Sequence, residues 1–103
     1  ADVLINCAAW GSKKPIPWEM MTKSRAIENQ CYMVALTQTG YIENGEYNLG
    51  ESRIIDYKGE EIASIKIGEE IVDATLDIDL MYDVREKSPT VQDIRDNYEV
   101  CVL

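Results

Sequence analysis

The three cysteines are the residues of this chain best suited to covalent chemistry, and they occupy positions 7, 31 and 101. A reactive cysteine needs a neighbour that lowers its thiol pKa, usually a histidine, a lysine or a helix N-terminus. The sequence contains no histidine, so it cannot form a serine-histidine-aspartate or a cysteine-histidine arrangement. Cys7 lies inside an apolar run, and Cys31 follows a predicted helix whose dipole disfavours a thiolate there. We predict that both are small buried hydrophobic residues and that the chain holds no catalytic residue.

Metal and cofactor sites are not indicated either. The cysteines are widely spaced, and without histidine they cannot complete an ordinary zinc site. No P-loop, GxGxxG, HExxH or EF-hand spacing is present. Carboxylates are abundant, but their spacing singles out no acid/base pair; Glu28 lies three residues after Arg25, and we predict a structural ion pair between them. We therefore expect no metal and no cofactor.

The composition indicates one globular domain of 103 residues with 46% hydrophobic residues. Nineteen acidic and ten basic residues leave a formal charge of -9, which argues against nucleic acid and anionic membrane surfaces as partners. No apolar run approaches the roughly 20 residues of a membrane span. The odd number of widely spaced cysteines is typical of a reduced protein, and we predict a cytoplasmic location.

The elements that would position these residues follow from the apolar patterns. An apolar run predicts a strand over 2–8, and the helix that follows has Pro17 in its first turn and extends to about residue 30. Four further strands are predicted over 31–39, 51–57, 61–67 and 70–78, the last three as an antiparallel meander, with a turn at Asn44-Gly45 before them. A second helix is predicted from Asp79, its cap, to Pro89.

This order predicts an α+β fold with mostly antiparallel strands, one early helix and one late helix. Two helices cannot cover a sheet of about five strands even on one full face. We therefore expect the chain by itself to expose an apolar sheet face and to form a dimer or an aggregate.

The first helix has two unlike sides on a helical wheel. One side is mainly apolar and is predicted to contact the sheet; it carries Met20, Met21, Ser24, Ile27 and Cys31. The opposite side mixes an aromatic ring with polar groups and is predicted to contact something else; it carries Trp18, Thr22, Arg25 and Asn29.

Four stretches, taken in order and with their spacing, resemble the C-terminal part of a nitrilase-superfamily carbon-nitrogen hydrolase. They are "ADVLINCAAW", "RAIENQCYMV" with a Trp before it, "GESRIIDYKGEEIASIKIGEEIVDATLDI" and "VREKSPTVQDIRDNYEV". The likeness is strongest to the small amidase branch that includes omega-amidase. It implies that residues 1–103 are a single partial domain, the C-terminal portion of an α-β-β-α sandwich that usually dimerises through helices.

The resemblance also implies hydrolysis of a small amide or nitrile by a Glu-Lys-Cys triad. In this family the Glu is the general base for the Cys, whose thiolate forms a thioester and releases ammonia, and the Lys stabilises the oxyanion. The family's nucleophile precedes a Tyr, an acid and, two residues further on, an Arg, upstream of the segment that matches "ADVLI". Cys31-Tyr32 is followed by Met33 and Val34, so it matches the strand after the helix, and none of the three catalytic positions is present.

Other positions carry over from the family. Trp10 matches a Trp beside the substrate pocket, and Ala9 stands where the family often has Asn, which leaves the substrate preference open. The helix from Trp18 to Gln30 matches one usually found at the dimer interface. The resemblance therefore places its mixed side, with Trp18, Thr22, Arg25 and Asn29, at that interface.

Three hypotheses follow. The first is the C-terminal part of a carbon-nitrogen hydrolase, inactive alone, which pairs with a second copy or with the missing N-terminal part; a sequence that opens inside a predicted strand favours it. The second is a non-catalytic binding or dimerisation module that keeps half of the fold. The third, an independent enzyme using Cys7 or Cys31, lacks a base to activate either thiol.

Overall fold

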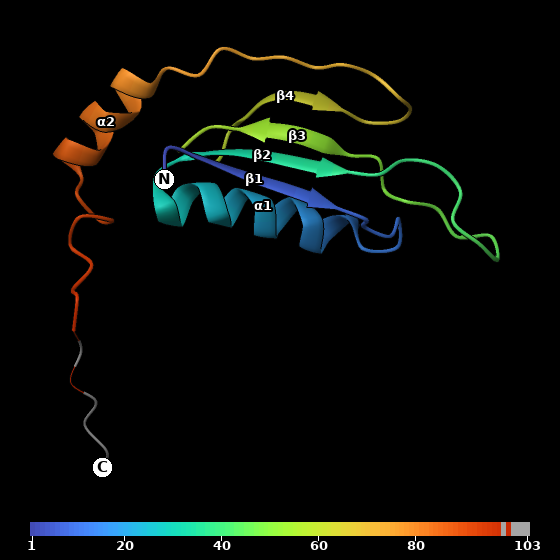
Figure 1. The fold of residues 1–103 in the computed structure, drawn as a ribbon, viewed down its shortest axis with the longest axis horizontal. Coiled ribbons are helices and arrows are strands. Elements are labelled where there is room, and N and C mark those ends of the chain that lie inside the picture. Colours follow the sequence, from blue (N-terminus) through green and yellow to red (C-terminus); the bar gives the residue numbers. More distant parts are fainter. Residues whose placement is uncertain (98, 100–103) are drawn as a thin grey trace.

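The computed structural model describes residues 1–97 and 99 of the chain. Its elements in chain order are β1 (Val3–Ala8), α1 (Pro15–Asn29), β2 (Tyr32–Thr37), β3 (Ser52–Ile55), β4 (Glu61–Ile65) and α2 (Ile78–Lys87). Figure 1 shows α1 along one face of a sheet and α2 beyond the end of that sheet.

The four strands form one mixed sheet in the order β1-β2-β3-β4. β1 and β2 are parallel, whereas β2-β3 and β3-β4 are antiparallel pairs. Parallel neighbours need a long crossover connection, and α1 provides it. The α+β class, with mostly antiparallel pairs and one early and one late helix, is confirmed.

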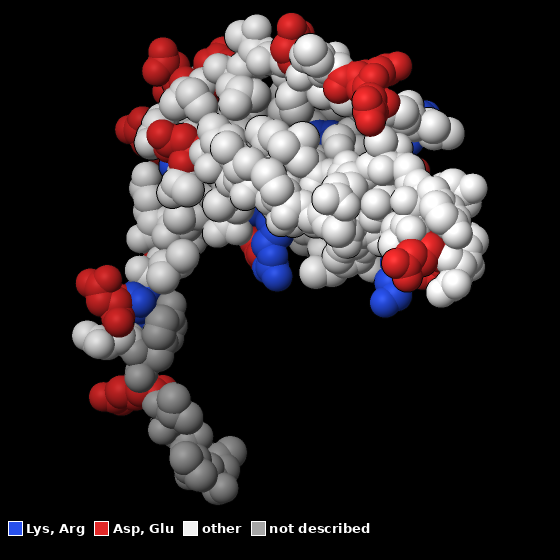
Figure 2. All heavy atoms as spheres, turned by 45° about the vertical axis from the view of Figure 1, so that its right-hand side comes forward, with Lys and Arg blue, Asp and Glu red and all other residues white. Residues whose placement is uncertain are grey.

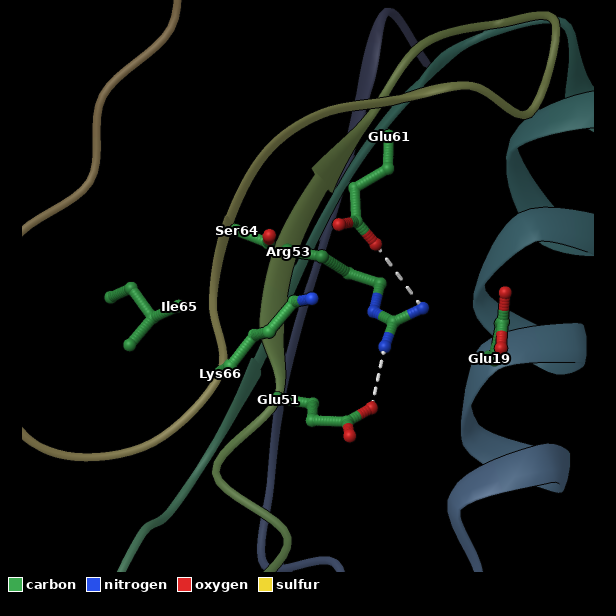
Figure 3. A pocket seen from close by; sticks show the side chains of 7 residues that line it. All are labelled: Glu19, Glu51, Arg53, Glu61, Ser64, Ile65 and Lys66. Atoms are coloured by element: carbon green, nitrogen blue, oxygen red, sulfur yellow. Dashed lines mark hydrogen bonds and ion pairs between the residues drawn. The ribbon is translucent and has the colours of Figure 1, made fainter.

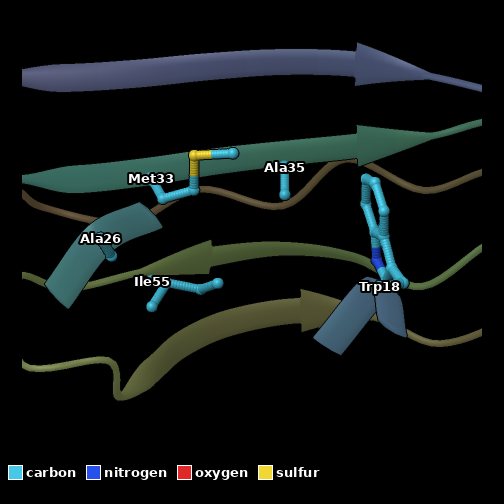
Figure 4. Close-up of a cluster of buried hydrophobic side chains, with 5 residues drawn as sticks. All are labelled: Trp18, Ala26, Met33, Ala35 and Ile55. Carbon is cyan, nitrogen blue, oxygen red and sulfur yellow. The ribbon is translucent and has the colours of Figure 1, made fainter. Parts of the chain in front are cut away.

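α1 packs its most buried side chains against β2 and β3 (Figure 4). The helix begins at Pro15, where the missing N–H of proline is tolerated, and ends at Asn29; the next residue, Gln30, caps it in a left-handed conformation with φ of 46°. The core cluster consists of Trp18, Ala26, Met33, Ala35 and Ile55.

The predicted orientation of α1 was wrong. Trp18 is 1% exposed and Thr22 is also buried, whereas Met20 is 63% exposed and Met21 and Ile27 are exposed as well. The indole N–H of Trp18 donates to the Glu51 carbonyl at 2.8 Å, and the Thr22 hydroxyl donates to the Trp18 carbonyl at 2.8 Å. These bonds remove the cost of burying polar atoms, which a wheel based on hydropathy alone does not include.

A second cluster joins α2 to the amino ends of β1 and β2. It contains Cys31, Tyr32, Tyr57 and Met81. Arg85 of α2 is buried beside this cluster and donates to the carbonyls of Gln30 at 2.8 Å and Ala1 at 2.6 Å. These two hydrogen bonds attach α2 to the residues that directly precede β1 and β2.

Two predicted features of the C-terminal half differ in the structure. Residues 66–77 contain no strand, so the strand predicted over 70–78 was wrong. Residues 72, 74 and 76 are half-buried and their neighbours exposed, so the apolar alternation is present, but no named strand of the described chain pairs with it. The cap of α2 is Asp77, whose side chain accepts from the Leu80 N–H at 2.9 Å, and Asp79 lies in the first turn instead.

The sheet face opposite α1 is largely uncovered. Ile5 is 69% exposed, and Cys7 and Leu36, which point to the same side, are exposed too. Figure 2 shows acidic groups along the margins of a broad uncharged area, with Lys and Arg only at separate positions on that view. Among the described residues, no helix is both long and apolar enough to cross a membrane.

Candidate functional site

The carboxyl ends of β1 and β2 lie side by side because the two strands are parallel and in register, with Ala8 opposite Thr37. The Gln38 N–H donates to the Ala8 carbonyl at 3.0 Å, so the two chains stay together as they leave the sheet. In sheets with parallel strands, ligands usually bind beyond these carboxyl ends. We therefore take this edge as the candidate site.

Trp10 stands at this edge in a fixed orientation. Its backbone N–H donates to the Thr37 hydroxyl at 3.1 Å, and its indole N–H donates to the Lys14 carbonyl at 2.6 Å. Its ring centroid lies 5.4 Å from that of Trp18 in a tilted stack. The family resemblance assigned Trp10 to substrate binding, which stays a prediction; in the structure Trp10 is half-buried.

The loop that follows Trp10 is joined to the segment between β2 and β3. The Leu49 N–H donates to the Trp10 carbonyl at 2.7 Å, and the Ser12 N–H donates to the Tyr47 carbonyl at 2.9 Å. This segment turns at Asn44-Gly45, where both residues have positive φ, as the sequence predicted. Loop and hairpin therefore form one continuous wall.

A first hollow lies on the sheet face opposite α1. Its volume is about 420 Å³, and it is lined by Cys7, Ala8, Ala9, Leu36, Thr37 and Gln38. The prediction that Cys7 is buried was wrong, because its side chain points to the uncovered face. Apart from the Cys7 thiol, no lining side chain can be deprotonated, so the hollow provides a mostly apolar surface and no base for that thiol.

A second hollow of about 250 Å³ lies between the loop and the hairpin, lined by Gly11, Ser12, Lys13, Lys14, Glu46 and Tyr47. Lys13 pairs with Glu46 at 2.6 Å. The hydrogen bond and charge of Lys13 hold the pKa of Glu46 below its ordinary value. Lys14 makes no ion pair with any residue that the structure describes, so no such residue neutralises this lysine in the lining of the hollow. Sequence reasoning assigned neither lysine to a site, although Lys13-Lys14 is the only pair of adjacent basic residues in the sequence and directly precedes α1.

Cys31 is buried, as predicted. Desolvation raises the pKa of its thiol, and the charge of Arg85 opposes this shift only in part. A thiol with a raised pKa is a poor nucleophile at neutral pH. Cys101 lies outside the described residues. Within those residues, no group of three or more His, Cys, Asp or Glu side chains is placed to hold a metal ion.

The four residues predicted for a dimer interface do not share one surface. Trp18 and Thr22 are buried against the sheet of their own chain, so neither is open to a partner. Arg25 and Asn29 are exposed, and Arg25 forms the predicted ion pair with Glu28. The sequence does hold a signal for the buried side, since Trp18, Thr22 and Ala26 recur at intervals of four residues.

The sequence profile of the carbon-nitrogen hydrolases matches residues 1–86. The chain belongs to this family. It is 38% identical over 95 residues to 2-oxoglutaramate amidase of Bacillus subtilis, a match that covers 92% of this chain and 36% of that protein. It is 33% identical over 93 residues to Omega-amidase YafV of Escherichia coli K12, covering 89% of this chain and 36% of that protein.

The fold agrees with solved structures of carbon-nitrogen hydrolases. XC1258 from Xanthomonas campestris, a protein of this superfamily, superposes with a TM-score of 0.85 at 27% identity, covering 97% of this chain and 37% of that one. The resemblance to the amidase-like branch is thereby confirmed at the level of the family. The chain spans about a third of the length of these carbon-nitrogen hydrolases.

Proposed function

We propose that this chain forms one wall of a site that hydrolyses a small amide carrying a carboxylate, and that the catalytic Glu, Lys and Cys come from polypeptide outside these 103 residues. The observation that supports this most is Trp10, which is held in a fixed orientation at the carboxyl ends of a parallel strand pair, with its chain neighbours Ala9 and Gly11 in the linings of the two hollows. The amidase names of the relatives agree with it.

The substrate's polarity is inferred from the two hollows. The apolar lining with Leu36 suits a short carbon chain, whereas the Lys14 ammonium, which pairs with no carboxylate among the described residues, suits a substrate carboxylate. The relative named 2-oxoglutaramate amidase acts, by its name, on an amide that also carries acid groups. An acidic ω-amide of similar size is therefore the proposed substrate class.

In the proposed reaction this chain positions the substrate and does not form or break bonds. Trp10 is held by Thr37 and by the Lys14 carbonyl, so its ring presents a rigid surface. A rigid surface keeps the amide carbon near an attacking thiolate and excludes water. The family chemistry then gives a thioester with loss of ammonia, followed by hydrolysis.

The partners that we propose for this chain are inferred from its exposed apolar surfaces. The outer side of α1 carries the exposed Ile16, Met20, Met21 and Ile27, and the open sheet face carries Ile5 and Leu36. Surfaces of this kind mark contacts with other polypeptide. We propose that the outer side of α1 meets a second copy, in place of the Trp18 side predicted from the wheel, and that the sheet face meets the remainder of the sandwich. A cytoplasmic location is part of the same proposal.

The second candidate function is a non-catalytic binding or dimerisation module. It is favoured by the first hollow, whose lining offers no base for Cys7. The two candidates differ in one measurement, the release of ammonia from acidic ω-amides by the natural gene product.

The test compares ammonia release by the natural gene product, its Trp10→Ala variant and the 103-residue chain. We expect hydrolysis by the natural product, a raised KM in Trp10→Ala and no activity of the chain alone. An inactive natural product supports the binding module. Activity of the chain alone that is lost in Cys7→Ser contradicts the proposal that the catalytic groups lie elsewhere.

A further inference from the structure

A third cavity lies on the other face of the sheet, and most of its lining comes from β3, β4 and the residues next to them. It has a volume of about 290 Å³ and is lined by Glu19, Glu51, Arg53, Glu61, Ser64, Ile65 and Lys66. α1 packs on β2 and β3, and the cavity occupies the space between α1 and the β3-β4 edge. We call it the Arg53 cavity (Figure 3).

The buried guanidinium group of Arg53 forms the floor of the cavity. The Arg53 side chain is 6% exposed, and its guanidinium pairs with Glu51 at 2.9 Å and with Glu61 at 3.4 Å. Figure 3 shows it reaching from β3 toward Glu19 on α1. Its Nε–H is buried and has no hydrogen-bond acceptor among the described residues. Buried donors without an acceptor are rare in folded proteins and often indicate a missing bound group.

The frame around this donor is rigid. The carbonyl of Glu51 accepts the indole N–H of Trp18 at 2.8 Å, which fixes the backbone next to Arg53. Glu19 pairs with Lys23 at 2.6 Å along α1, and that bond and charge lower the pKa of the Glu19 carboxyl, so it is ionised at neutral pH. A helix and two paired strands therefore hold the charged groups, as in a preformed ligand site.

The charged groups that line the cavity favour a ligand that carries both a positive and a negative group. Three carboxylates repel a simple anion, whereas the Arg53 Nε–H, the Ser64 hydroxyl and the Lys66 ammonium offer donors to an acceptor group. The volume lies at the low end of small-molecule sites, which are about 300 to 1,000 Å³. A small zwitterion meets these conditions, because its ammonium group can face Glu19 while its carboxylate faces Lys66 and Arg53.

We propose that the Arg53 cavity binds an α-amino acid. The ammonium group pairs with Glu19, and the carboxylate accepts from Lys66, from Ser64 and from the Arg53 Nε–H, which has no acceptor among the described residues. This site is separate from the candidate amidase site and does not depend on the proposed function.

The test follows the Arg53 Nε–H resonance in the ¹⁵N-labelled intact protein during titration with L-alanine. Acetate and ethylammonium, each carrying one of the two charges, are the matched probes at equal ionic strength. We expect a saturable shift with L-alanine and none with either probe. No saturable shift with L-alanine, or an equal shift with acetate or ethylammonium, overturns the proposal.

Rim variants complete the test, because Arg53→Met removes a buried cation from between two carboxylates and can prevent folding. Glu19→Gln and Lys66→Met change more accessible groups and should each weaken L-alanine binding about tenfold or more, as expected for the loss of one charge-assisted hydrogen bond. Lys87→Met, on α2 outside the cavity, is the matched control and should bind as the parent does. Unchanged affinity in both rim variants contradicts the assignment.

Discussion

The indole N–H of Trp18 donates to the carbonyl of Glu51 over 2.8 Å, and this bond joins α1 to the start of β3 across 33 positions of the chain. It explains why the side of α1 with fewer apolar residues faces the sheet. The same bond allows a first prediction about stability.

Trp18→Phe should lower the free energy of unfolding by about 1 to 3 kcal/mol, because it leaves the Glu51 carbonyl unpaired and the core underfilled. Urea unfolding measures the change. Met20→Leu, on the exposed side of the same helix, is the control and should stay within about 0.5 kcal/mol of the parent. If Met20→Leu costs as much as Trp18→Phe, the orientation of α1 described here is incorrect.

Arg85→Met should loosen α2 from the sheet. It leaves the carbonyls of Gln30 and Ala1 without their donors, and loss of hydrogen bonds to a charged donor costs about 1.5 to 3 kcal/mol. In hydrogen-exchange measurements, the substitution should speed the exchange of the α2 amides more than that of the β2 amides, relative to the parent. Lys87→Met, at the exposed end of α2, should leave these exchange rates unchanged.

Gly59→Ala should destabilise the turn between β3 and β4 for two separate reasons. A Cβ at Gly59 would lie 2.6 Å from the Cδ1 atom of Ile27, and the residue has φ of 86°. Gly68→Ala, with φ of 95° and open space around it, measures the cost of the backbone alone, about 1 kcal/mol. Gly59→Ala should lower the free energy of unfolding by more than Gly68→Ala does. Adding Ile27→Ala to Gly59→Ala should remove this extra loss, relative to Ile27→Ala alone; if the extra loss remains, it would falsify the contact between positions 59 and 27.

Alkaline pH should reduce stability through Cys31. Desolvation raises the pKa of its thiol above the ordinary value of 9.0, so the folded state holds this proton more tightly than the unfolded state. The stability contributed by the protonated Cys31 thiol is complete below the pKa of this thiol in the unfolded state, and it is lost as the pH rises through its pKa in the folded state. In a Cys101→Ser background, the free energy of unfolding should fall above about pH 8.5, and less steeply in Cys31→Ala.

Thiol labelling provides the accompanying control. In the same Cys101→Ser background, Cys7 should react at once with a thiol reagent and Cys31 only after unfolding, because Cys7 is exposed and Cys31 is buried. Equal reaction rates of the two thiols in the folded protein would contradict the burial of Cys31.

Self-association of the isolated chain should depend on the two exposed apolar surfaces. Leu36→Glu should reduce association in sedimentation velocity experiments if the open sheet face drives it, and Met20→Glu should do so if the outer side of α1 drives it. Glu28→Gln, an exposed polar change on α1, is the control. A chain that is already a monomer contradicts both contributions.

Much of this protein could be read from the sequence because the patterns were local. The apolar run of β1, the prolines in the first turn of α1, the Asn-Gly turn and the α+β order each depend on neighbouring residues, and each matches the structure. Trp10 could be placed at the end of β1 for the same reason. The family resemblance rested on several such stretches in a fixed order, and residues 1–86 match that family.

Other features were decided by contacts between residues far apart in the chain. Whether Trp18 or Met20 faces the sheet depends on an acceptor at Glu51, 33 positions away from Trp18. Whether residues 70–78 become a strand depends on a partner strand, because an extended segment gains its hydrogen bonds only from a neighbour. The burial of Arg53 in a carboxylate cage depends on three elements meeting. Sequence patterns determined which segments could be helices and strands, and tertiary packing decided which of their faces are buried.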